Sequence, residues 1–108
     1  MLDLLAQKTE YTVSEISFAI KQLVETSFAN VRVKGEIFGA KRADSGHWYL
    51  SLKDENSILS AVCWRGVANA LTVKIEDGLE VIATGRITTF NGRSSYQLII
   101  EKLEIAGQ

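Results

Sequence analysis

The stretch that decides the fold class is VRVKGEIF, residues 31–38, in which apolar residues or glycine alternate with mostly charged ones. A period of two is typical of a β-strand with one face on a core and the other in solvent. The same period is found at residues 47–53, 58–64, 81–87 and 96–100. In the run 58–64 most residues are apolar, so the pattern leaves open which face points inward. Five short strands predict a mainly β protein.

A helix is predicted in front of the first strand. Thr12 and Glu15 have the spacing of a capping box, in which each side chain accepts a hydrogen bond from the other residue's backbone N–H. Apolar residues then recur at helical spacing, and polar residues occupy the other faces. The apolar positions are Val13, Ile16, Ile20, Leu23 and Val24. We therefore expect an amphipathic helix over about residues 12–26.

Turn-forming residues separate the predicted strands. Residues 41–46 and 54–57 are polar, and Asp54 is expected to cap the second of these turns. Asn91 followed by Gly92 is the strongest signal for a two-residue hairpin turn.

Two glycines interrupt strand patterns. Gly35 and Gly85 stand where a sheet is expected to coil sharply or to bulge. Residues 65–71 favour a short helical turn between the third and fourth strands. A five-stranded Greek-key barrel of the OB type fits this order best. An open antiparallel sheet or a sandwich is the alternative.

The composition fits one ordinary globular domain over residues 1–108, with 46% hydrophobic and 23% charged residues. Cys63 is the only cysteine, so the chain cannot form an internal disulfide, which fits a reducing compartment. The first residues lack a secretory signal, and no apolar run has the length of a membrane span. We expect a cytoplasmic protein without membrane contact.

The charge of the chain is unevenly distributed. A net charge of −1 by itself argues against a nucleic-acid partner, yet residues 31–53 sum to +3 and residues 81–93 to +2. In an OB barrel these segments border the face of the second and third strands, which binds oligonucleotides or oligosaccharides. The predicted fold therefore assembles a cationic groove on a nearly neutral chain.

Three aromatic residues are candidates for stacking on bases. Tyr49 faces outward if the second strand turns Trp48 toward the core, Trp64 joins it if the third strand has the matching register, and Phe90 lies at a hairpin tip. His47 is either a groove residue or a loop anchor. The candidate DNA-binding residues are Arg32, Lys34, Lys41, Arg42, His47, Tyr49, Lys53, Trp64, Arg65, Arg86, Phe90 and Arg93.

Metal binding and catalysis find no support in the residue pattern. His47 is the only histidine, and neither Cys63 nor the carboxylates stand at ligand spacing from it. Asp44, Ser45 and His47 are too close together on one loop to take the geometry of a catalytic triad. We expect no metal, no cofactor and no catalytic residue.

The run SGHWYLSLKDE, residues 45–55, resembles the N-terminal domain of the large subunit of bacterial exodeoxyribonuclease VII. The resemblance extends from about residue 11 to residue 107. It implies an OB domain that grips single-stranded DNA and feeds it to a separate nuclease domain. It also implies a downstream helical region that recruits several small subunits. Further matching positions are Val13–Glu15, Val33–Ile37, Asp77–Gly78, Val81, Gly85 and Tyr96–Leu98.

Single-stranded DNA binding without hydrolysis is therefore the expected function of this chain. Two alternatives stay open. In the first, the OB face or the N-terminal helix binds a protein subunit, with Val62 and Trp64 contributing an apolar patch. In the second, the domain binds RNA in the manner of anticodon-binding OB domains.

Overall fold

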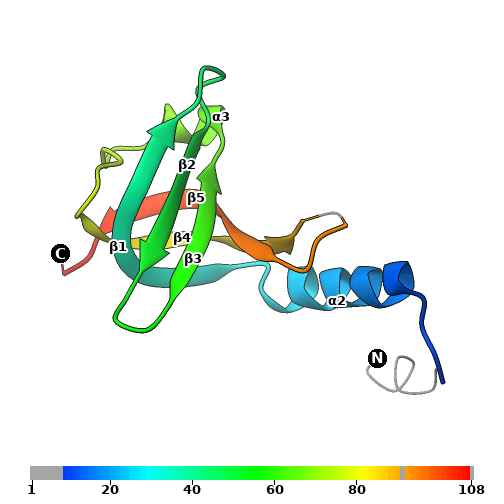
Figure 1. Cartoon of the computed structure of the whole chain (residues 1–108). Coiled ribbons are helices and arrows are strands. Elements are labelled where there is room, and N and C mark those ends of the chain that lie inside the picture. Colours follow the sequence, from blue (N-terminus) through cyan, green and yellow to red (C-terminus); the bar gives the residue numbers. More distant parts are fainter. Residues whose placement is uncertain (1–8, 91, 108) are drawn as a thin grey trace.

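A computed structural model describes residues 9–90 and 92–107, and these residues form a closed five-stranded barrel with a long helix beside it and a short helix between its third and fourth strands (Figure 1). The strands close in the order β1-β2-β3-β5-β4, with β3 and β5 parallel and all other neighbours antiparallel. This confirms the OB-type barrel and rules out the open sheet and the sandwich. The elements are α2 (Val13–Ser27), β1 (Val31–Arg42), β2 (Trp48–Lys53), β3 (Ile58–Cys63), α3 (Arg65–Ala68), β4 (Glu80–Thr89) and β5 (Tyr96–Ile105).

The barrel interior is filled by the apolar residues of the alternating patterns. On β2 the alternation holds as predicted, because Leu50 and Leu52 are buried whereas Tyr49 and Lys53 are exposed. The half-buried Trp48 packs against the same core. The open question on β3 is settled as well: its inward set is Leu59, Ala61 and Cys63. Fully buried side chains at the centre are Ile37, Leu98, Ile100 and Val81.

Val62 corrects one expectation. Its side chain points away from the inward set of β3 and is nevertheless completely buried. It lies opposite Tyr49 on β2 and Ile99 on β5, and Ile99 is buried too. Val62 therefore cannot contribute to an exposed apolar patch with Trp64.

Glycines allow the strands to bend around the small barrel. The β4–β5 register shifts between Thr84 and Gly85, which confirms the bulge expected there. At Gly35 the register is regular, but the backbone of β2 comes so close that a Cβ would lie 3.2 Å from the Lys53 carbonyl oxygen. Gly39, which the alternation did not single out, has φ +62° and lies in a second irregularity, between Phe38 and Lys41.

Several element ends differ from the predicted ones. β1 continues to Arg42, so Lys41 and Arg42 belong to the strand and not to the loop after it. The turn between β4 and β5 is longer than the two residues that Asn91 and Gly92 suggested, because Phe90 donates a backbone hydrogen bond to Ser95. Asn91 itself lies outside the described residues. The side chain of Asp54 accepts backbone hydrogen bonds from Asn56 and Ser57, which confirms its capping role.

The predicted helix is present, with the capping box between Thr12 and Glu15 formed in both directions. It lies beside the barrel and touches it through β4 (Figure 1). Among the residues that the structure describes, no helix has the length and apolarity to cross a membrane.

The buried position of Cys63 leads to a first prediction. Burial raises the pKa of the Cys63 thiol to about 11, and only the thiolate is nucleophilic. We expect iodoacetamide at pH 8 to alkylate the folded chain at least about 100-fold more slowly than the chain unfolded in guanidinium, whose thiol has a pKa of about 8.5. Equal rates in the two states would mean that the barrel opens readily at β3.

Candidate nucleic-acid interface

The outer face of β1 and β2 carries an exposed tyrosine beside a lysine. Tyr49 is 47% exposed, and Lys41 stands directly opposite it in the β1–β2 register. This pairing depends on the irregularity at Gly39. From Phe38 to Lys41 the strand β1 advances three residues while β2 advances two, from Ser51 to Tyr49. Without the extra residue Lys41 would fall opposite Trp48 and point toward the core.

A second aromatic residue lies where β3 passes into α3. Trp64 is 39% exposed, and its ring meets the His47 ring edge-on with 5.0 Å between centroids. Nδ1 of His47 accepts the backbone N–H of Arg65 at 2.8 Å. The Arg65 guanidinium donates to the Ser45 carbonyl at 3.4 Å. His47 therefore anchors the loop before β2 to the start of α3.

These residues form one surface, which we call the aromatic face. It combines the end of β1, the first half of β2 and the start of α3. Within residues 9–90 and 92–107, neither Lys41 nor Arg42 nor Arg65 forms an ion pair with a carboxylate. Their charges therefore stay available to a phosphate. The aromatic face consists of Lys41, His47, Tyr49, Trp64 and Arg65. Arg42 stands opposite Trp48 in the register, so it projects from the other side of β1, and it is exposed at the end of that strand.

Four other predicted cations are paired with carboxylates. None of the four belongs to the aromatic face. Arg32 and Lys34 lie in the part of β1 that pairs with β4, opposite Thr84 and Ile82. All four pairs are solvent-exposed, so each contributes at most about 1 kcal/mol and can be exchanged for a phosphate at little cost. The pairs are Arg32–Glu104 at 3.4 Å, Lys34–Glu80 at 3.4 Å, Lys53–Glu36 at 3.8 Å and Arg86–Glu101 at 3.9 Å.

The turn between β4 and β5 supplies a separate aromatic and cationic group. The Arg93 guanidinium lies over the Phe90 ring, 6.0 Å from its centroid. Both residues line a groove of about 610 Å³ between this turn and α2. Phe18 and Tyr96, which the sequence reasoning did not select, line the same groove and are mostly exposed. The alternation gave no signal for Tyr96, because this residue has the same period-two position as the buried Leu98 and Ile100. Nothing in the sequence placed Phe18 beside this turn.

The described part of the chain contains no group of three or more histidine, cysteine or carboxylate side chains placed to hold a metal ion. Exposed rings can stack on bases, and nearby cations can hold phosphates.

Comparison with known proteins assigns this chain to a family. A family model described as an OB-fold nucleic acid binding domain matches residues 11–104. The exodeoxyribonuclease 7 large subunit of Zymomonas mobilis is 57% identical over 98 residues, which are 91% of this chain and 18% of that protein. The same subunit of Rhodospirillum centenum is 54% identical over 92% of this chain and 19% of its own length. The chain thus spans about a fifth of these relatives.

Solved structures show the same fold at low identity. Asparaginyl-tRNA synthetase from Pyrococcus horikoshii, complexed with asparaginyl-adenylate, aligns with a TM-score of 0.57 and 21% identity, covering 79% of this chain and 21% of that one. The S. pombe Stn1-ten1 complex aligns with a TM-score of 0.60 and 20% identity, covering 73% and 59%. From the barrel and the family match together, the chain belongs to the OB-fold nucleic acid binding domain family, in the form shared with exodeoxyribonuclease 7 large subunits.

Proposed function

We propose that this domain binds single-stranded DNA and presents it to the nuclease part of a longer exodeoxyribonuclease VII large subunit. The observation that carries the proposal is the aromatic face, where two exposed rings stand beside cations that pair with no carboxylate of residues 9–90 or 92–107. Rings at Tyr49 and Trp64 can stack on bases only when those bases are unpaired, which selects a single strand over a duplex.

In this proposal the 108-residue chain has no hydrolytic activity by itself. Contacts with small subunits belong to other parts of the longer polypeptide, and the domain works in the cytoplasm. The names of the relatives support the link to a nuclease, because they describe exodeoxyribonuclease large subunits. Sequence preference should be slight, because stacking accepts every base.

The experiment that tests the proposal is a titration of fluorescent oligothymidylate at two salt concentrations. Phosphate contacts release counterions, so the logarithm of affinity should fall by about 0.7 per contacted phosphate for each tenfold rise in salt. Oligouridylate of the same length serves as the comparison strand. No measurable binding at low salt contradicts the proposal, and a clear preference for oligouridylate favours the RNA-binding alternative.

Charge-reversal variants distinguish direct contacts between arginine and phosphate from long-range electrostatic attraction between the whole protein and DNA. Arg42→Glu and Arg93→Glu should each weaken binding and flatten the salt slope by about 0.7, the value of one lost phosphate contact. Lys74→Glu, an exposed lysine between α3 and β4, makes the same change of charge away from both groups and should have little effect. If all three variants lose affinity equally, only long-range attraction is acting and the interface has been assigned to the wrong residues.

A further inference from the structure

The strand β1 contains an extra residue just before it reaches the aromatic face. Gly39 and Ala40 together stand opposite Leu50, whereas the next residue, Lys41, is paired with Tyr49. Gly39 has φ +62°, the left-handed conformation in which a glycine opens a bulge of this kind. Because the side chains of a strand alternate between its two faces, the extra residue decides that Lys41 points outward beside Tyr49.

The bulge is bound by a side chain from a distant part of the chain. A bulge interrupts the hydrogen bonds between strands, so its backbone N–H needs an acceptor from elsewhere. The Ala40 N–H donates to Oδ1 of Asp77 at 2.9 Å, and the two residues are 37 positions apart in the sequence. Hydrogen bonds to an ionised carboxylate are stronger than those to a neutral acceptor. Asp77 therefore stabilises the bulge in its present position.

The backbone around Asp77 is held by contacts that do not involve the carboxylate. The Gly78 N–H donates to the Ile37 carbonyl at 2.8 Å, and the Ile37 N–H donates to the Leu79 carbonyl at 2.9 Å. Ile75 is buried in the barrel core, and Leu79 packs against that core. Asp77 itself is exposed. Substitution of its side chain should therefore release the bulge and leave the course of the chain on either side of residue 77 unchanged.

The position of the bulge matters because it brings a cation next to a ring. Residues directly opposite each other in an antiparallel pair have Cβ atoms about 4.5–5.5 Å apart. Lys41 and Tyr49 are such a pair, and both are exposed. A base stacked on the ring and a phosphate held by the ammonium group can then belong to one nucleotide. If the register slipped by one residue, Lys41 would turn toward the core and the ring would lose this cation.

We propose that Asp77 is a positioning residue for DNA binding: it holds the bulge at Gly39, and the bulge keeps Lys41 beside Tyr49 as the cation of a one-nucleotide subsite. This inference rests on the proposed function, because it names the part of the aromatic face that takes a nucleotide. Asp77 does not contact DNA. By its charge alone an aspartate weakens DNA binding, whereas by holding the bulge Asp77 strengthens it. The two effects have opposite signs, so a substitution separates them.

Titration of oligothymidylate measures the effect of Asp77 on affinity. Asp77→Ala removes an acidic residue, yet we expect it to weaken binding about three- to tenfold at low salt and to flatten the salt slope by about 0.7, the value of one phosphate contact. Asp77→Asn keeps an oxygen that accepts the Ala40 N–H and should bind within about twofold of the wild type. Glu76→Ala removes the same charge from the exposed neighbouring residue and should not weaken binding.

A double variant shows whether Asp77 acts through Lys41. The combination of Lys41→Ala and Asp77→Ala should bind as weakly as Lys41→Ala alone, because the second substitution has no phosphate contact left to remove. Losses of affinity that add up in the double variant overturn the proposal. So does an Asp77→Ala variant that binds as tightly as the wild type.

Nuclear magnetic resonance of the free protein tests the register without DNA. We expect nuclear Overhauser effects between the side chains of Lys41 and Tyr49 in the wild type and in Asp77→Asn, and their loss or weakening in Asp77→Ala. Melting temperatures check that each variant is folded. Unchanged effects in Asp77→Ala mean that Asp77 does not hold the bulge. If the wild type itself fails to bind oligothymidylate, the proposed function is wrong and the positioning role with it. If the wild type binds and only the Asp77 variants depart from expectation, the positioning role alone is wrong.

Discussion

Gly85→Ala should prevent the barrel from closing normally. A Cβ built on Gly85 would lie 1.9 Å from the carbonyl oxygen of Ile99, a backbone atom of the neighbouring strand. The atoms that this Cβ would meet belong to the backbone of β5 and not to a flexible side chain. The paired backbones of β4 and β5 would therefore have to move apart. Overpacking a core by one methyl group typically costs about 1–3 kcal/mol, and a backbone clash at a bulge should reach or exceed the upper end. Urea unfolding followed by tryptophan fluorescence measures the loss.

Gly66→Ala is the matched control for that substitution. Gly66 lies in α3, and a Cβ there meets no atom within 4 Å. Alanine is the better helix former by roughly 1 kcal/mol, so this variant should be as stable as the wild type or slightly more stable. If Gly85→Ala unfolds at the same urea concentration as Gly66→Ala, the bulge at β4–β5 can relax and is not what closes the barrel.

Tyr49→Ala should separate DNA binding from folding. Tyr49 stands on the outer side of β2, so its removal opens no core cavity and the melting temperature should stay close to that of the wild type. Loss of one stacking ring should reduce affinity for oligothymidylate by about 1–3 kcal/mol, which is a factor of roughly 5 to 150.

Trp48→Ala, one residue earlier, is the counterpart. Its half-buried ring packs on the barrel core, so the substitution should lower stability by about 2–4 kcal/mol. Any effect on DNA affinity should follow from unfolding. The reverse outcome, a stable Trp48 variant that binds poorly beside a Tyr49 variant that unfolds early, would assign stacking to the wrong side of β2.

Local periodicity was sufficient to predict most of the fold. The alternation in VRVKGEIF and in the other strands reports which side chains enter the core, because the pleat sends successive residues to opposite faces. The capping box at Thr12 is equally local, since its partners are three residues apart. For the same reason the outward direction of Tyr49 could be predicted from β2 alone.

The sequence did not show which charged residues lie together. Arg32 and Lys41 lie on the same strand, yet β1 bends so sharply that one faces β4 and the other faces β2. Only the closed barrel reveals that Arg32 and Lys34 face away from the aromatic face and that their charges are met by Glu104 and Glu80. Such ion pairs join strands distant in sequence, so no local pattern reports them.

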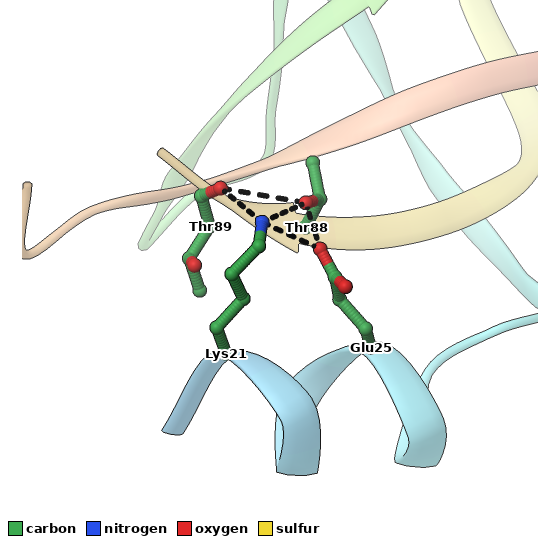
Figure 2. Close-up of polar contacts among 4 residues, drawn as sticks. All are labelled: Lys21, Glu25, Thr88 and Thr89. Carbon is green, nitrogen blue, oxygen red and sulfur yellow. Dashed lines mark hydrogen bonds and ion pairs between the residues drawn. The ribbon is translucent and has the colours of Figure 1, made fainter. Parts of the chain in front are cut away.

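The sequence by itself determined that α2 is amphipathic, because helical spacing is a property of consecutive residues. Only the tertiary structure decided which side of that helix meets the barrel. Lys21 and Glu25 form hydrogen bonds with Thr88 and Thr89 at the end of β4, more than sixty residues later in the sequence (Figure 2). These hydrogen bonds fix the rotation of the helix about its axis. A helix can turn about its axis without changing its own hydrogen bonds. Its orientation is therefore set by partners that the helix sequence does not contain, and here they leave the apolar residues Val13, Ile16, Ile20 and Leu23 exposed.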